Sequence, residues 1–155
     1  MAIKYHYEKI IKETLRDQIA ASLKPNVMFG IDRIHEVDGK FKIYVLIETL
    51  GNSPTYNYIG TDRLISNELT LSVEIVVKGN DEMLIKDKLE EYKYIVYDAL
   101  FSTKDRKQLG GKVDKMNMGQ STNFDDDDGD ASIIGVSTNL IIYYKQKESD
   151  FSTNV

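Results

Sequence analysis

The sequence predicts an α+β fold, a two-layer sandwich in which two helices pack on one face of a mostly antiparallel sheet of about four to six strands. The first observation is that residues 69–101 read as an alternating strand, a short turn and a long amphipathic helix. The second is that more alternating segments and one more amphipathic helix surround this unit, without a linker or an internal repeat. We therefore expect a single domain over residues 1–155, in which residues 145–155 form a flexible polar tail.

The composition supports a globular domain and excludes several classes of chemistry. Hydrophobic residues make up 41% of the 155 residues and charged residues 29%, and the net charge is −5. An acidic chain of this kind does not carry the basic footprint of a nonspecific DNA-binding protein. The absence of cysteine excludes disulfides, thiolate nucleophiles and cysteine-ligated metals. Because no signal peptide and no apolar run of about 20 residues is present, we expect no membrane association.

The first helix is expected over residues 5–23. Its apolar stripe recurs every four residues, at Tyr7, Ile11, Leu15, Ile19 and Leu23. Pro25 follows directly after Lys24, and a residue before proline is disfavoured in the helical region, so the helix should end there.

A hairpin is expected next. Residues 27–36 and 41–50 are apolar runs joined by an Asp38-Gly39 turn, which is a strong hairpin signal. The cluster Gly51-Asn52-Ser53-Pro54 then predicts a break. Residues 55–59 are compatible with a short strand or an extended loop, and the whole segment 51–67 is expected to be an exposed connection.

The strand expected at residues 69–78 has one apolar face, formed by Leu69, Leu71, Val73, Ile75 and Val77. Asn80 or Asp81 is the expected N-cap of the second helix, which should end near Phe101. Its predicted stripe comprises Met83/Leu84, Lys88/Leu89, Tyr92, Val96 and Ala99/Leu100, with Ile85 and Ile95 flanking it.

The remaining elements are a weakly patterned strand at residues 112–118 and a long strand at residues 131–144. Between them lies an acidic segment, residues 123–130, which we interpret as a solvated hairpin turn. Its aspartates are Asp125, Asp126, Asp127, Asp128 and Asp130. A calcium loop of the EF-hand type does not fit, because placing Gly129 at loop position six puts Phe124 and Gly135 at the required ligand positions one and twelve. A weak divalent-ion site of another kind is the alternative.

No catalytic set is recognisable. His6 and His35 are the only histidines, and neither has another metal-ligand candidate at a characteristic spacing. No GxSxG, SxxK, HExxH or phosphate-loop pattern occurs. We therefore predict no enzyme activity, no cofactor and no metal.

Two sets of residues suggest partner contacts instead. Tyr94 and Tyr97 lie off the main helix stripe and are the first candidates for subunit contact, with ordinary half-buried tyrosines as the alternative. Apolar residues also occur on the second face of the strands, at Leu46, Val76, Ile133 and Ile141. Since a two-layer domain leaves one sheet face open, these residues predict a homo-oligomer.

The order of these elements resembles the tail terminator family of tailed bacteriophages, the tail-completion or head-to-tail joining proteins. The resemblance covers nearly the whole chain: an N-terminal helix, a hairpin, the strand "ELTLSVEIVVKGN", a helix containing "YIVYDALF", the acidic "NFDDDDGD" and the closing strand "IIGVSTNLIIYYK". It lies in this arrangement and not in any residue-specific motif, so no individual binding residue is carried over.

The resemblance implies a structural virion protein at the head-proximal end of the tail, assembled in the host cytoplasm. Proteins of this family form a ring, here expected to be a hexamer, that stops polymerisation of the tail tube and docks the neck or connector. The implied partners are further copies of the chain, the tail tube protein and the neck protein, with the tail sheath as a further candidate. DNA would only pass through the lumen, and the acidic segment would line the lumen or a rim. The long hairpins would suit strand-edge pairing between subunits.

Two other interpretations stay open on the sequence alone. One is a different neck or baseplate-proximal tail protein of similar build. The other, from a separate class, is a small cytoplasmic α+β enzyme or ligand-binding domain.

Overall fold

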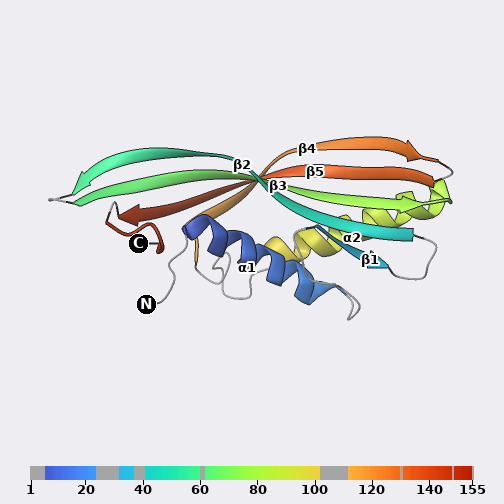
Figure 1. Cartoon of the computed structure of the whole chain (residues 1–155), viewed down its shortest axis with the longest axis horizontal. Coiled ribbons are helices and arrows are strands. Elements are labelled where there is room, and N and C mark those ends of the chain that lie inside the picture. The colour runs from blue at the N-terminus through green and yellow to red at the C-terminus, as the bar shows by residue number, and fades with distance from the viewer. Residues whose placement is uncertain are drawn as a thin grey trace.

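A computed structural model describes most of the chain: residues 6–23, 32–36, 41–59, 62–101, 112–129, 131–147 and 149–154. The elements in chain order are α1 (Tyr7–Ser22), β1 (Asp32–Glu36), β2 (Phe41–Ile59), β3 (Asp62–Gly79), α2 (Glu82–Phe101), β4 (Lys115–Asp128) and β5 (Ala131–Lys147). The strands form one sheet in the order β1-β2-β3-β5-β4, and every neighbouring pair is antiparallel. Figure 1 shows both helices below the same face of this long, twisted sheet. The predicted α+β sandwich is confirmed.

Helix α1 forms where the four-residue periodicity predicted it. Tyr7, Ile11, Leu15 and Ile19 are buried against the sheet and α2. At its start, the backbone N–H of Glu8 donates to Nδ1 of His6 at 3.3 Å, which satisfies one of the otherwise unpaired N–H groups of the first turn. The chain leaves the helix at Leu23, which is extended.

Helix α2 begins with the predicted cap. The Asp81 carboxylate accepts hydrogen bonds from the backbone N–H groups of Met83 at 3.1 Å and Leu84 at 3.3 Å. The prediction for Met83 is wrong, because this side chain is 84% exposed, and Ile85 takes the buried position of that turn. The buried stripe comprises Ile85, Leu89, Tyr92, Val96 and Leu100.

The core lies between the helices and one face of the sheet. The alternating residues Leu69, Leu71, Val73, Ile75 and Val77 of β3 are all buried on this face. Their register partners on β5 include Val136, Leu140 and Ile142, which are also buried. The pattern of β3 therefore placed the helix-covered face correctly.

The connection expected over residues 51–67 is instead a continuous pair of long strands. β2 runs through the Gly51–Pro54 cluster and stays in register with β3 as far as the Ile59–Asp62 pair, after one bulge between Thr49 and Gly51. Pro54 is tolerated because an edge strand can turn its missing N–H group away from its neighbour. We call residues 50–59 and 62–68 the β2–β3 arm. In Figure 1 the arm reaches well past the N-terminal end of α1.

The acidic segment is also strand and not turn. Asp125 to Asp128 continue β4, and Asp128 pairs with Ala131 across a two-residue loop. Gly129 has φ 64°, the left-handed conformation that such short loops need. Sequence reasoning misplaced this element because aspartate has a low strand propensity, whereas pairing with the strongly apolar β5 decides the structure. Asp130 lies outside the described residues.

Part of the segment expected to be a polar tail belongs to the sheet, and the rest contacts the start of α1. β5 continues to Lys147, and residues 149–154 fold back under the sheet. The backbone N–H of Tyr7 donates to the carbonyl oxygen of Phe151 at 2.9 Å, and Lys145 N–H donates to Asn154 Oδ1 at 2.8 Å. The rings of His6 and Phe151 stack with centroids 6.0 Å apart. These contacts join the C-terminal segment to the start of α1.

Candidate partner-binding surfaces

The aspartates of β4 do not converge on one point. Asp125 is in register with Ile134, which pairs with Val77 on the helix-covered face, whereas Asp126 pairs with Ile133 on the opposite face. Both side chains are exposed, and they border a hollow of about 310 Å³ at the start of α2, where Lys86 also lies. Within the described part of the chain, no group of three or more acidic or histidine residues is arranged to hold a metal ion. This strand end presents negative charge on both faces of the sheet.

The two candidate tyrosines have different environments. Tyr94 is 73% exposed on the outer face of α2 and is available for a partner. Tyr97 points inward: its hydroxyl lies 2.6 Å from Oγ1 of Thr138, and its ring packs against the core. Thr138 is fully buried on β5 and also lies 2.9 Å from the Ser121 hydroxyl. Tyr97 is therefore a structural residue, and the alternative of a half-buried tyrosine holds for it.

Removing the Tyr97 hydroxyl should cost stability. Tyr97→Phe leaves Thr138 Oγ1 buried with one hydrogen-bond partner fewer, so we expect a loss of about 1 kcal/mol in the free energy of unfolding. Urea denaturation followed by circular dichroism measures this change. Tyr94→Phe is the matched control and should be neutral, because that side chain is exposed; equal losses in the two variants would contradict the assignment.

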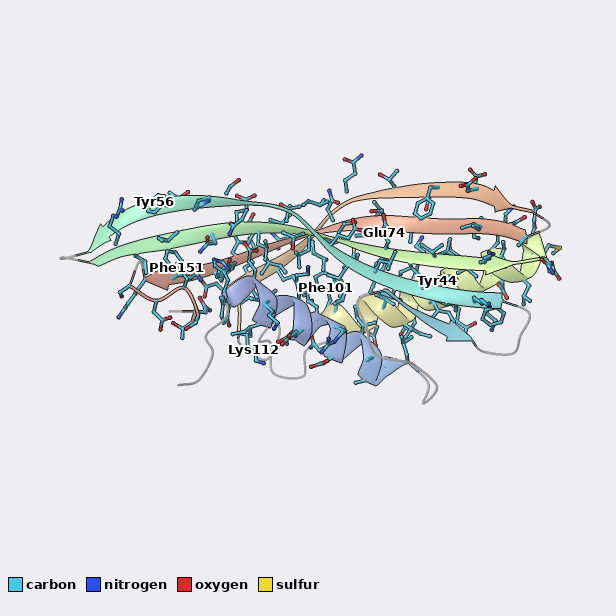
Figure 2. The ribbon with its side chains drawn as sticks, viewed as in Figure 1. Tyr44, Tyr56, Glu74, Phe101, Lys112 and Phe151 are labelled. Carbon is cyan, nitrogen blue, oxygen red and sulfur yellow. The ribbon has the colours of Figure 1, made fainter. Side chains whose placement is uncertain are left out.

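The open face of the sheet carries an apolar belt that runs across four strands. In one row of the register, Tyr44 on β2 faces Val76 on β3, which faces Gly135 on β5, which faces Phe124 on β4. The Phe124 ring lies over Gly135: a Cβ atom added there would be 2.3 Å from Phe124 Cζ. Figure 2 shows Tyr44 on its strand and Glu74 in the next row. We name the four side chains Tyr44, Val76, Phe124 and the adjoining Leu46 the belt.

The sequence predicted part of this face. Leu46, Val76, Ile133 and Ile141 lie on the open face as expected, and they are half-buried by their neighbours. Phe124 was missed, because it stands between polar and acidic residues and acquires its role only through the register that sets it opposite Gly135. An isolated aromatic residue in a polar segment, with a glycine on the following strand, is the only signal the sequence offers.

A buried polar network ties the β2–β3 arm to the helix layer. The side-chain amide of Asn52 donates to Glu8 Oε1 and to Asn67 Oδ1, both at 3.1 Å. Asn67 in turn donates to Gln146 Oε1 at 3.1 Å, and Gln146 donates to the Phe151 carbonyl oxygen at 2.6 Å. Asn67 and Gln146 are almost fully buried. The network therefore fixes the base of the arm to α1 and to the C-terminal segment.

Three buried tyrosines are expected to make the folded state less stable at high pH. Burial raises the pKa of Tyr144, Tyr7 and Tyr92 above the usual 10.0, most strongly for Tyr144. A raised pKa means that the folded state keeps a proton which the unfolded state releases, so this contribution to stability is complete below about pH 10 and decreases above it. We expect the unfolding free energy to fall between about pH 10 and 12. Urea titrations across this range should show a shallower fall for Tyr144→Phe, and an identical slope would contradict this.

A shallow groove beside α1 completes the described surface features. It has a volume of about 300 Å³ and is lined by His6, Glu8, Lys9, Lys12, Glu13, Arg16 and Thr49. Lys9 pairs with Glu13 at 3.7 Å and Arg16 with Asp17 at 3.2 Å, so the groove has charges of both signs. Most of its lining residues are charged, which is the composition of an ordinary solvated helix surface. For His35 only the backbone position, on β1, is described.

The comparisons with known proteins identify no family for this chain. No described helix is long and apolar enough to cross a membrane. No protein-family model matches the chain, and a search of curated proteins finds no match.

Proposed function

We propose that this protein is a phage tail terminator: a structural virion protein that forms a ring on the head-proximal end of the tail tube. The ring would stop tube polymerisation and provide the surface on which the neck or connector docks. The observation that carries the proposal is the half-covered sheet. The helices bury one face, while the other bears the belt of Tyr44, Leu46, Val76 and Phe124, which come from three strands, with the Phe124 ring lying over Gly135 of the fourth. An apolar row of this kind, between rows that contain Lys42, Lys78 and Glu74, supports a role for this face in an assembly.

A ring follows from this kind of surface when each copy contacts two neighbours through different patches. Such a heterologous interface closes if the rotation between copies completes a circle, and its two rims then differ. Two different rims suit the two proposed partners, the tail tube on one side and the neck on the other. Tyr94, exposed on the outer face of α2, is our proposed contact for a neighbouring subunit or one of these partners.

The acidic end of β4 has a proposed role in DNA passage. Asp125 and Asp126 are exposed there, and Asp127, Asp128 and Asp130 follow in the chain. We place this end at the lumen or at a rim, where negative charge repels phosphate and keeps DNA from adhering.

Substitution of these five aspartates by asparagine tests that role. The expected result in the parent phage is a drop in infectivity with tails of normal length, because DNA would be retained by the ring. The matched control changes the exposed Asp87 and Asp98 of α2 to asparagine, and should leave infectivity unchanged. Normal infectivity of the β4 variant would contradict a role for this charge.

The ring itself is tested with purified protein and with the phage. Light scattering after gel filtration should give a mass several times the 17.7 kDa of one chain, and electron micrographs should show closed rings. Disruption of the gene should give tails of uncontrolled length and heads without tails. A protein that is monomeric at all concentrations would contradict the proposal and favour the enzyme or ligand-binding class. Rings combined with normal tail length would favour a different neck or baseplate-proximal protein.

A further inference from the structure

The two outer strands of the sheet present long edges to which the described part of the chain adds no further strand. Among the described residues, β1 is the only strand that pairs with the outer edge of β2, and its register ends where Asp32 meets Leu46. The rest of β2, residues 47–59, pairs with β3 on its inner side. On the other side of the sheet, β5 is the only described strand that pairs with β4. Each such edge offers a row of N–H and C=O groups that another strand can pair with.

Charged side chains, which protect many natural edge strands, are absent from most of these two edges. Their remaining irregularities are a bulge between Thr49 and Gly51 and Pro54 in β2, and a register shift between Met118 and Ser121 in β4. Residues 49–59 of β2 and residues 116–124 of β4 contain no charged side chain. Among the described residues of the sheet, the large apolar side chains with the greatest exposure all lie on these two strands: Leu50 at 56%, Tyr56 at 50%, Met118 at 43% and Phe124 at 36%. Figure 2 shows Tyr56 far along the β2–β3 arm. Uncharged edges of this length with exposed Leu, Tyr, Met and Phe side chains are candidates for pairing with another strand.

The strand directions allow β2 of one copy to pair with β4 of the next. β2 is antiparallel to β3, β3 to β5 and β5 to β4, so β4 runs opposite to β2. A second copy placed beside the first, with its β2 against the first copy's β4, therefore continues an antiparallel sheet. In this arrangement the helices of both copies lie on the same side. The chain thus carries both halves of a strand-pairing interface.

We infer that copies of this chain join edge to edge, with residues 47–59 of β2 pairing with β4 of the neighbouring copy to form one continuous sheet. This inference rests on the proposed ring and names the contact that builds it. Every copy uses one edge of each kind, which makes the interface heterologous and allows the sheet to close.

The position of β1 sets the stagger between copies. Through the register, Phe124 of β4 lies level with Tyr44 of β2 in the same chain, whereas the part of β2 beyond β1 starts only at Ile47. The neighbour's β4 must therefore shift along β2 toward the β2–β3 arm. A constant shift between successive copies tilts the strands relative to the ring axis, which a closed sheet requires. Pro54 removes one donor from this edge, so the pairing lacks one hydrogen bond there.

Lysine substitutions that block one edge at a time test the inference. The β2-edge variant combines Leu50→Lys with Thr55→Lys, and the β4-edge variant combines Met118→Lys with Thr122→Lys; all four positions are exposed. Lysine on an edge strand opposes pairing, so each variant alone is expected to be a monomer in light scattering. A one-to-one mixture should form a dimer, because one variant keeps an intact β4 edge and the other an intact β2 edge. The control, Ala21→Lys with Met83→Lys on the two helices, adds the same charge and should keep the wild-type ring.

The outcomes separate this inference from the proposed function. A monomeric wild type contradicts the ring itself. A wild-type ring that persists in both edge variants, or monomeric variants that form no dimer on mixing, overturns edge pairing and leaves the ring standing. Hydrogen exchange on the wild type gives a readout that does not depend on the variants. Amides of residues 47–59 and 115–128 should exchange about tenfold more slowly, or slower still, in the ring than in diluted monomer, and equal rates would overturn the inference.

Discussion

Gly135→Ala is expected to lower the free energy of unfolding by about 2–3 kcal/mol, which corresponds to a melting temperature lower by about 5–10 °C. Alanine in the middle of a strand would ordinarily be more stable than glycine. Here the added Cβ would lie 2.3 Å from Phe124 Cζ and 2.9 Å from the Ile75 carbonyl oxygen. The Phe124 ring must move off the sheet, and the backbone of β3 cannot move as easily. Thermal unfolding followed by circular dichroism measures the effect.

A second glycine and a double variant give the controls. A Cβ atom added to Gly51 would have no other atom within 4 Å, so Gly51→Ala should change stability by less than about 0.5 kcal/mol. Gly135→Ala should cost less in a Phe124→Ala background, since the ring contact is then absent and only the Ile75 contact remains. Strictly additive losses would show that the ring does not lie over the glycine.

Asn67→Ala is expected to cost about 2–4 kcal/mol in the free energy of unfolding. Asn67 accepts a hydrogen bond from Asn52 and donates one to Gln146 in a region where both Asn67 and Gln146 are buried. Removing it leaves Gln146 Oε1 without its donor, whereas Asn52 keeps Glu8 and the Tyr144 hydroxyl as acceptors. A buried polar group left unpaired costs about 1–3 kcal/mol, and the lost packing of the Asn67 side chain adds to this. Urea denaturation gives the loss directly. Hydrogen exchange should also rise in residues 149–154, because Gln146 then holds Phe151 less firmly.

The matched control for this substitution is Asn123→Ala. Asn123 is exposed on β4, so its replacement should be nearly neutral. A similar small effect at Asn67 would mean that the network contributes little and that the C-terminal segment is held by other contacts.

The local signals of the sequence were sufficient for the helices and for the core. A four-residue apolar repeat and a proline placed α1 within two residues of its observed start and one of its end, and the Asp81 cap placed the start of α2. The alternation of Leu69 to Val77 identified the helix-covered face of the sheet. These features depend on side-chain periodicity and on hydrogen bonds between near neighbours, which the sequence contains directly.

Strand pairing decided the features that the sequence placed wrongly. Gly51 to Pro54 and Asp125 to Asp128 have poor strand propensity, yet each segment pairs with a long apolar strand that holds it in the sheet. The contact between the C-terminal segment and α1 was not predicted, because the carbonyl oxygen of Phe151 accepts from Tyr7, far away in the chain. For Tyr97 the sequence left subunit contact and a half-buried position open, because its partner Thr138 lies on a different element.

The periodicity of apolar residues indicates which side chains are buried. Together with the composition, it was enough to predict an acidic α+β domain with two helices, long strands and an apolar core. The surfaces that carry the proposed function emerge only in the folded molecule. The Phe124–Gly135 contact, the belt across four strands and the two outer edges all depend on register and strand order. Register is a relation between residues distant in the chain, and it is fixed by the cooperative packing of the whole sheet and not by any local stretch.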